Sequence, residues 1–215
     1  DGPDGHSLWP GFTNVPNEFI ESYFPLRIER YETIPDSGGA GLHRGGNGLS
    51  VAYRFLCDGD IGIHDERWLT YPWGVLGGET GLRSTKRLVR VDGSEQWLPA
   101  KAEGIKVKTG DMLYFNTWGG GGWGDPFARD PELVQQDVNR RLVTVDGARR
   151  YGVVMASDGS VDQDATQTLR AELKAAAGEP ALFNFGGDVE EIRARCEAET
   201  HLPAPVKPTF IGASQ

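Results

Sequence analysis

A glycine-rich loop between positions 35 and 48 holds the first group of residues whose types suit chemistry. Asp36, Ser37, His43 and Arg44 bring a carboxylate, a hydroxyl, an imidazole and a guanidinium into this loop. Such a set suits a pocket for a carboxylate or amide substrate, because it offers acceptors and charge-assisted donors at close range. A structural alternative stays open, in which Asp36 pairs with Arg44 and Ser37 caps a turn.

A second candidate pair is formed by Glu18 and Glu21, which are three residues apart. One helical turn would place both carboxylates on the same face. Paired carboxylates suit proton transfer or a divalent cation. The alternative is an ordinary solvated helix face.

Other motifs for catalysis or cofactor binding are missing from the sequence. It contains no Gly-x-Ser-x-Gly elbow and no Gly-Lys-Ser or Gly-Lys-Thr, and Gly38-Gly39-Ala40-Gly41 is not followed by a helical pattern. We therefore expect neither a serine triad nor a phosphate loop. We also expect no complete metal site, because metal-ligand spacing is absent among the four histidines, which are His6, His43, His64 and His201.

The elements that must position these residues are marked by glycine. The chain has 30 glycines in 215 residues, which is about twice the usual share of ~7%. Most of the excess falls in three loops at 38–48, 74–81 and 119–124. Glycine at this density permits both tight turns and close backbone approach around a pocket. We expect the three loops to do both.

Short strands are predicted between the glycine loops, because apolar residues alternate there and turn residues separate the runs. We expect hairpin turns at 57–60 and 92–93 and a further turn at 105–111. A short helix is expected at 19–24, where Pro25 ends it. The expected strands cover 26–34, 49–56, 61–68, 86–91, 95–98 and 112–117.

Helices dominate the rest of the predicted chain. Asp130-Pro131-Glu132 is typical of a helix start, with Asp130 as N-cap and Pro131 in the first turn. The remaining expected elements are a short helix at 144–150, a strand at 153–155, helices at 166–177 and 189–199, and an extended end at 201–215.

These elements predict an α+β fold. Residues 1–155 form a mostly antiparallel β unit with glycine-rich loops, closed by short helices. Residues 156–215 form a helical tail with an extended arm.

Composition limits the functional classes. The net charge is −9 and the calculated pI is about 5.0, which disfavours binding to phosphate backbones, so we expect no nucleic-acid partner. No apolar stretch is long enough to span a membrane, and we expect no membrane partner. Cys57 and Cys196 form no dense framework, which favours reduced thiols and a cytoplasmic location. Because the chain opens without methionine, we expect it to be part of something longer.

The ordered motifs of the chain resemble the hydantoinase B/5-oxoprolinase family. The resemblance extends over residues 14–154, about two-thirds of the chain. It rests on Asn14-Val15-Pro16-Asn17-Glu18, Asp36 to Gly48, Pro72-Trp73-Gly74-Val75-Leu76-Gly77-Gly78, Gly119 to Pro126, Arg129-Asp130-Pro131-Glu132 and Ala148 to Val154.

The resemblance implies a function. This family includes ATP-dependent hydantoinases, 5-oxoprolinases and the large subunits of acetone and acetophenone carboxylases. The chain is similar to the C-terminal portion of a B-type subunit. ATP and Mg²⁺ would be bound by a hydantoinase A-like partner subunit, and a divalent metal would lie in the missing N-terminal portion of the B-type subunit, which is a second expected partner.

The implied reaction is hydrolysis of a cyclic amide, such as a hydantoin, oxoproline or lactam, after phosphoryl activation by the A-type partner. One alternative is ATP-dependent carboxylation of a ketone, and another is a non-catalytic scaffold within such a complex. From loop position and chemistry, we expect catalytic roles for Glu18, Asp36, Ser37 and Arg44, with Glu18 as proton carrier. We expect the small-molecule substrate to contact Asn14, Glu21, Gly38, Gly39 and His43.

Overall fold

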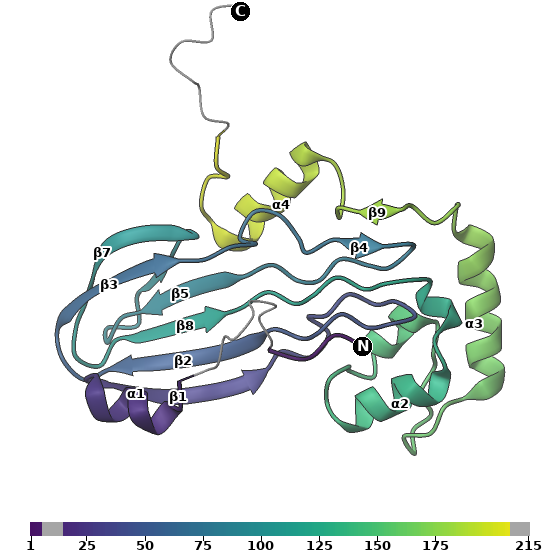
Figure 1. The fold of residues 1–215 in the computed structure, drawn as a ribbon, viewed down its shortest axis with the longest axis horizontal. Helices are drawn as coiled ribbons and strands as arrows, with labels where there is room; N and C mark the ends of the chain where they lie inside the picture. The colour runs from purple at the N-terminus through teal and green to yellow at the C-terminus, as the bar shows by residue number, and fades with distance from the viewer. Residues whose placement is uncertain (6–14, 207–215) are drawn as a thin grey trace, which may run out of the picture.

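The main element of the fold is a five-stranded antiparallel sheet (Figure 1). The computed structural model describes residues 1–5 and 15–206. Neighbouring strands of the sheet are antiparallel throughout. In spatial order they are β1 (Leu26–Thr33), β2 (Leu49–Phe55), β8 (Met112–Asn116), β5 (Thr85–Val89) and β6 (Glu95–Trp97).

Two smaller strand pairs complete the β unit. β3 (Gly59–His64) pairs with β7 (Lys101–Val107), and β4 (Gly74–Val75) pairs with β9 (Phe183–Asn184). The β3–β7 pair covers one end of the sheet. Its Ile63 and Val107 share a buried cluster with Phe55, Leu88 and Leu113 of the sheet. This burial stabilises the contact because it removes apolar side chains from water.

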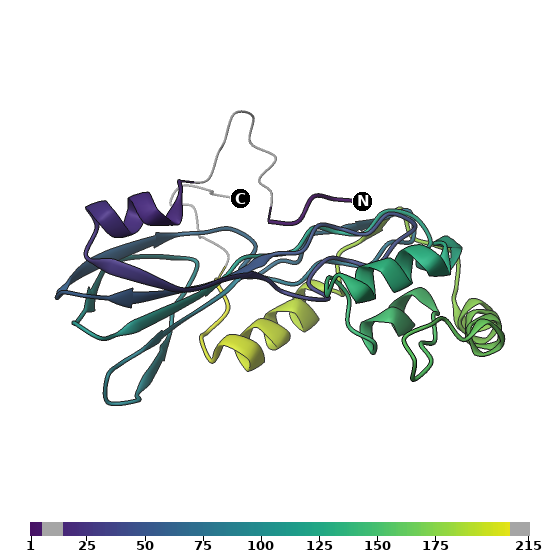
Figure 2. The ribbon, with the colours of Figure 1, turned by 90° about the horizontal axis from the view of Figure 1, so that it is seen from below.

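The helices are α1 (Asn17–Tyr23), α2 (Pro131–Asn139), α3 (Gln163–Ala176) and α4 (Val189–Thr200), with 3₁₀ turns η1 (Pro126–Ala128) and η2 (Gly147–Tyr151). α2 begins as predicted, because the Asp130 carboxylate accepts a hydrogen bond from the Glu132 amide and Pro131 needs no partner in the first turn. In Figure 2, α2 and α4 lie on one side of the sheet, whereas α1 and residues 1–5 lie on the other.

The three glycine-rich segments 37–48, 74–81 and 119–124 run side by side as extensions of the sheet (Figure 1). We call them the glycine layer. Their backbones bond to one another: Gly39 N donates to Gly120 O at 2.8 Å, and Gly122 N donates to Glu79 O at 2.9 Å. A Cβ at Gly121 would overlap the carbonyl oxygen of Trp73. Glycine is therefore needed in this layer because backbone packs directly on backbone.

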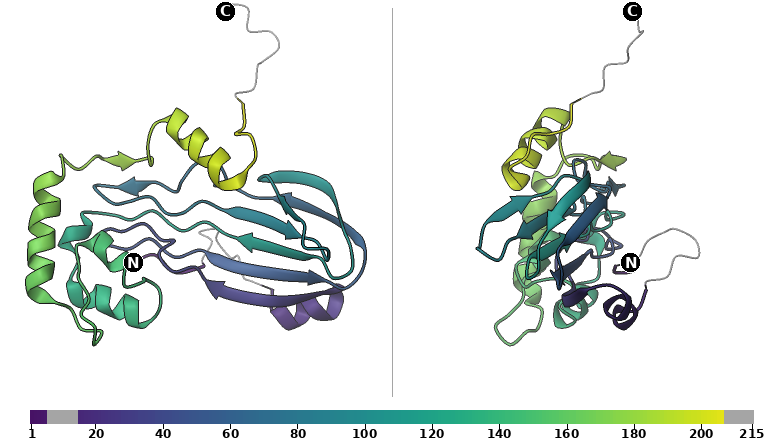
Figure 3. Two further views of the ribbon diagram at one scale, coloured as in Figure 1. Left: turned by 180° about the vertical axis from the view of Figure 1, so that it is seen from behind. Right: turned by 90° about the vertical axis from the view of Figure 1, so that its left-hand side faces the viewer.

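The α+β fold and the predicted tail helices are confirmed. The tail contacts the β unit at several points. The Arg170 guanidinium donates to the carbonyl oxygen of Arg129 at 2.6 Å, and β9 pairs with β4. Figure 3 shows α3 at the end of the molecule opposite β7. The division of the chain at residue 155 stays a prediction.

Four local predictions are wrong. The turn at 57–60 does not join two paired strands, because β3 pairs with β7 and buries Ile63 there. Residues 105–107 continue strand β7 and are not part of a turn. The short helix expected at 144–150 is replaced by the 3₁₀ turn η2 at Gly147–Tyr151, and 153–155 contribute one bridge, Met155 to Val161, instead of a strand. The hairpin at Asp92-Gly93 is confirmed by the pairing of β5 with β6.

Candidate functional site

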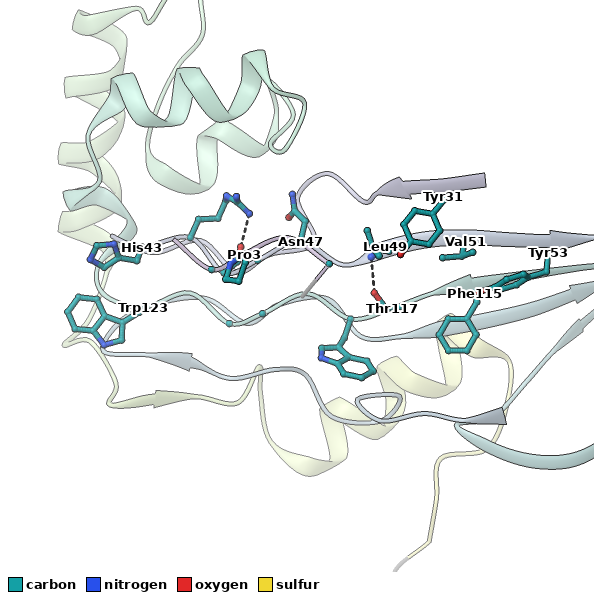
Figure 4. Close-up of a pocket in the computed structure, with 18 residues that line it drawn as sticks. Pro3, Tyr31, His43, Asn47, Leu49, Val51, Tyr53, Phe115, Thr117 and Trp123 are labelled. Carbon is teal, nitrogen blue, oxygen red and sulfur yellow. Dashed lines mark hydrogen bonds between the residues drawn. The ribbon is translucent and has the colours of Figure 1, made fainter. Parts of the chain in front are cut away.

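A surface hollow lies on the sheet face next to residues 1–5 (Figure 4). We call it the aromatic hollow, and its volume is about 630 Å³. Tyr31 of β1, Tyr53 of β2 and Phe115 of β8 line it together with Trp118. These side chains meet because residues 31 and 51 are opposite each other in β1 and β2, and residues 51 and 115 in β2 and β8. Its far wall is the glycine layer.

A second hollow, of about 600 Å³, lies on the opposite face of the sheet. Thr85 and Asn116 are opposite each other in β5 and β8 and line it, whereas Phe115 faces the aromatic hollow. Successive side chains of a strand point to opposite faces, so the two hollows are separated by the sheet. We call this one the charged hollow, because its ionic lining residues are Asp36, Glu79, Arg83, Arg150, Arg195 and Glu199.

The charges of this hollow are largely compensated by one another. The Arg150 guanidinium contacts the Glu79 carboxylate at 2.7 Å and donates to the carbonyl oxygens of Asp36 and Gly38. The buried Arg83 pairs with Glu199 of α4. Sequence reasoning did not single out Glu79 or Arg150, although Arg150 lies in a motif that carries the resemblance and Glu79 directly follows another. The sequence signal that could have found them is a charged residue next to a glycine or an aromatic residue, since Glu79 follows Gly78 and Arg150 precedes Tyr151.

Asp36 lines the charged hollow in an unusual conformation. Its φ of 62° lies in the left-handed region, which is uncommon outside glycine but tolerated by Asp. Its carboxylate accepts hydrogen bonds from the Thr144 amide at 3.0 Å and the Thr144 hydroxyl at 2.5 Å. Asp36 therefore joins the first glycine segment to Thr144, which lies three residues before η2.

Ser37 and Arg44 lie inside the protein. The Ser37 hydroxyl is fully buried, donates to the Ile34 carbonyl oxygen at 2.6 Å and accepts from the Gly48 amide at 2.9 Å. Arg44 is 4% exposed, and its guanidinium donates to the Asp4 carboxylate and to the Gly45 carbonyl oxygen, both at 2.8 Å. These contacts hold the loop in place, and a catalytic role for either residue stays a prediction.

The expected substrate contacts do not gather in one place. His43 is exposed at the edge of the aromatic hollow, with its ring 5.4 Å from that of Trp123. The amide of Gly38 donates to the Asn47 side chain at 2.8 Å, and the amide of Gly39 is bonded within the glycine layer. Asn14 lies outside the described residues.

The two glutamates are exposed on α1 and line neither hollow. Glu21 accepts a hydrogen bond from the Ile28 amide at 2.7 Å, which ties α1 to β1, and the carbonyl of Glu18 accepts from the Ser22 hydroxyl at 2.6 Å. The structure thus places Asp36 at the charged hollow and His43 and Arg44 at the aromatic hollow, whereas Glu18 lines neither hollow. Roles for these residues in catalysis or substrate binding stay predictions.

Comparison with known proteins decides the family. The hydantoinase B/oxoprolinase family model matches residues 1–126, a range that includes all three glycine segments. The chain belongs to the hydantoinase B/oxoprolinase family.

Two curated relatives show how much of a family member this chain represents. It is 36% identical over 161 residues to the caprolactamase subunit beta of Pseudomonas jessenii, covering 72% of this chain and 27% of the relative. It is 30% identical over 206 residues to the acetophenone carboxylase delta subunit of Aromatoleum aromaticum, covering 80% of this chain and 30% of the relative. The chain therefore spans less than a third of these relatives.

The fold agrees with that of a solved family relative. The crystal structure of the ATP-dependent caprolactamase from Pseudomonas jessenii matches with a TM-score of 0.64 at 32% identity, over 73% of this chain and 28% of the solved chain.

The glycine layer of this hydantoinase B-like chain does not have the form of a phosphate loop. Phosphate loops present free backbone amides at the start of a helix, whereas here the amides of Gly39, Gly120 and Gly122 donate to neighbouring carbonyls. Within residues 1–5 and 15–206, no three His, Cys, Asp or Glu side chains gather as a metal site. In the same residues, no helix combines the length and apolar character needed to cross a bilayer.

Proposed function

We propose that this chain is the C-terminal part of a B-type subunit in an ATP-dependent, multi-subunit enzyme that hydrolyses a cyclic amide. The observation that carries the proposal is the match to the ATP-dependent caprolactamase structure, with a TM-score of 0.64 over 73% of the chain. ATP and Mg²⁺ are assigned to an A-type partner subunit, and this assignment is supported by the amides of Gly39, Gly120 and Gly122, which donate to carbonyl oxygens within the glycine layer.

This chain would contribute walls and orienting groups to the assembled site. Asp36 is the proposed catalytic carboxylate, because it alone among the four proposed catalytic residues lines the charged hollow. It would accept or deliver a proton during opening of the amide. Ser37 and Arg44 would act through the backbone of the loop that presents Asp36 and His43. Glu18 lines neither hollow, so it would contact a substrate only in the assembled enzyme.

The test is to purify the native complex that contains this chain and identify its subunits by mass. ATP turnover is then measured with hydantoin, 5-oxoproline and caprolactam, and with acetone and acetophenone in the presence or absence of bicarbonate. We expect ADP formation coupled to appearance of the ring-opened amino acid. Turnover that requires a ketone and bicarbonate would instead establish the carboxylase alternative. A complex in which none of these compounds stimulates ATP turnover contradicts the proposal.

A further inference from the structure

Among the described residues, one apolar face of the sheet is covered at one end and open at the other. Phe55 and Leu113 lie at the covered end, beneath β3 and β7. Tyr53 and Phe115 pack against this buried cluster and also line the aromatic hollow. The core of the β unit therefore continues along β2 and β8 into the hollow without a break.

None of the described helices α2 to α4 closes this open end. α2 and α4 lie on the other side of the sheet (Figure 2), and α4 instead lines the charged hollow with Arg195 and Glu199. Two rings of the aromatic hollow are left well exposed, with Tyr31 44% and Trp118 39% accessible. A concave aromatic surface next to a buried core is typical of an interaction site.

The polar groups of the hollow are mostly occupied within this chain. The Asn47 side chain accepts from the Gly38 amide and donates to the Leu142 carbonyl oxygen, each at 2.8 Å. The Thr117 hydroxyl accepts from the Leu49 amide at 2.8 Å, and Arg44 is bonded to Asp4. A small polar ligand is oriented by a few free polar groups, so this lining is better suited to apolar side chains that fit by shape.

The neighbouring edge of the sheet is a poorer place for a partner. β1 is the edge strand and carries Arg27, Glu29, Arg30 and Glu32. Charged residues on an edge strand discourage addition of another strand. A protein partner on this side would therefore bind the sheet face and not its edge.

The occupant is indicated by the length of the relatives. The described residues that line the aromatic hollow all lie within 1–126, the part that matches the family model. The chain covers only 27% and 30% of two curated relatives, so most of such a subunit is outside this chain. We propose that the aromatic hollow binds an apolar segment from the remaining part of the B-type subunit, an inference that rests on the proposed function only for the existence of that part.

The experiment compares thiol labelling in the 215-residue chain and in the complete B-type subunit. Cys57, which is exposed, is first replaced by Ser. Tyr31→Cys then reports on the hollow, and Val91→Cys, at a position 71% exposed beside the β5–β6 turn, is the matched control. We expect maleimide to label both positions readily in the chain alone. In the complete subunit, labelling should slow about tenfold or more at position 31 and stay within about threefold at position 91.

Each alternative outcome overturns the inference in a recognisable way. Equal labelling of position 31 in both forms means that the hollow stays open. Protection that grows with the concentration of the isolated chain indicates a second copy. Protection of the isolated chain by caprolactam or hydantoin indicates a small-molecule pocket. The labelling needs neither ATP nor turnover, so a protected hollow in an inactive complex would contradict only the proposed function.

A pair of tryptophan variants gives an independent readout. Trp118→Glu places a charge in the aromatic hollow, whereas Trp73→Glu changes a tryptophan of similar exposure that does not line it. In the complete subunit, we expect Trp118→Glu to raise amide hydrogen exchange in β2 and β8 by about tenfold, and Trp73→Glu to leave it unchanged. The same comparison in the isolated chain should show no difference between the two variants in β2 and β8. A difference in that form would show that Trp118 acts on local folding and would contradict docking.

Discussion

The carboxylate of Asp1 accepts two hydrogen bonds from the guanidinium of Arg129, at 2.6 and 2.7 Å. Arg129 is 2% exposed, and it also donates to the carboxylate of Asp137 at 2.9 Å. Asp1 additionally accepts from the Arg44 amide at 2.8 Å. The first residues of the chain therefore neutralise and fix a cation buried beside the glycine layer.

The Asp1→Asn variant tests this contact. We expect the free energy of unfolding to fall by about 1–3 kcal/mol, because a buried guanidinium loses one of its two carboxylate partners and retains Asp137. Urea denaturation measures the change. The matched control is Asp60→Asn, which breaks an exposed pair with Lys106 and should cost about 0–1 kcal/mol. Equal effects of the two variants would contradict the structural role of Asp1.

The glycine layer predicts a sharp difference between two Gly→Ala variants. Gly121→Ala would drive its Cβ into the carbonyl oxygen of Trp73, which is backbone and cannot rotate away. We expect a loss of about 3 kcal/mol or more in unfolding free energy. Gly59→Ala is the control, since nothing lies within 4 Å of the added carbon, and its effect should stay within about 0.5 kcal/mol. Thermal denaturation of both variants decides the matter, and a tolerated Gly121→Ala would show that the layer is loosely packed.

The sequence predicted correctly those turns and helix ends that depend on residues close together in the chain. The hairpin at Asp92-Gly93 and the start of α2 at Asp130-Pro131 follow from turn and capping residues that act within a few positions. The turn at 57–60 carries similar signals, yet β3 pairs with β7, because burial of Ile63 against the sheet is a long-range effect.

The candidate site was less predictable for a related reason. Asp36 and Arg44 are eight residues apart in one loop, which suggested a common pocket. The segment between them lies within the glycine layer, so Asp36 faces the charged hollow and Arg44 lines the aromatic one. Glycine content indicated close backbone approach, but the partners in that approach come from segments distant in sequence. Glu79 and Arg150 join the charged hollow by the same long-range packing.

The Asp36→Asn variant tests the proposed catalytic carboxylate. If Asp36 exchanges a proton with the substrate, substrate-dependent ATP turnover of the purified complex should fall by about 100-fold, within the range of general acid–base catalysis. The subunit composition should stay the same by size-exclusion chromatography. Asp146→Asn, at an exposed aspartate without a side-chain cap bond in η2, is the control and should keep full turnover. Unchanged turnover in Asp36→Asn, with normal assembly, would remove Asp36 from the catalytic role.

A buried ion pair joins Lys86 of β5 to Asp65, and the Lys86 ammonium also contacts the Ser84 hydroxyl at 3.1 Å. Burial lowers the pKa of Lys86, and Asp65 opposes this shift. We expect Lys86→Met to cost about 3–5 kcal/mol of unfolding free energy, because it leaves the Asp65 carboxylate buried without its cation. The double variant Lys86→Met/Asp65→Leu should recover most of that loss, since neither charge remains. A double-mutant cycle by urea denaturation measures both effects, and simple additivity of the two substitutions would contradict the coupling.

The buried Tyr151 should make the free energy of unfolding depend on pH in the alkaline range. Its ring is 1% exposed in a cluster with Ala40 and Val134, and its hydroxyl has no hydrogen-bond partner among the described residues. Burial, opposed by nearby arginines, raises the pKa of Tyr151 to about 12, against about 10 in the unfolded chain. Its contribution to stability is therefore complete below pH ~10, falls as the pH rises, and is lost above pH ~12.

The Tyr151→Phe variant isolates that contribution. At pH 7 it should change the unfolding free energy by less than about 1 kcal/mol, because the buried hydroxyl it removes makes no hydrogen bond within the described residues. Between pH 10 and 12 the wild-type chain should lose about 3 kcal/mol more than the variant, since two pKa units correspond to that energy. Urea denaturation at a series of pH values gives the difference, in which the titration of all other groups cancels. The control is Tyr23→Phe, at a tyrosine 70% exposed, which should follow the wild type throughout. Parallel pH profiles for Tyr151→Phe and the wild type would contradict the prediction, because they would mean that burial does not change the ionisation of Tyr151.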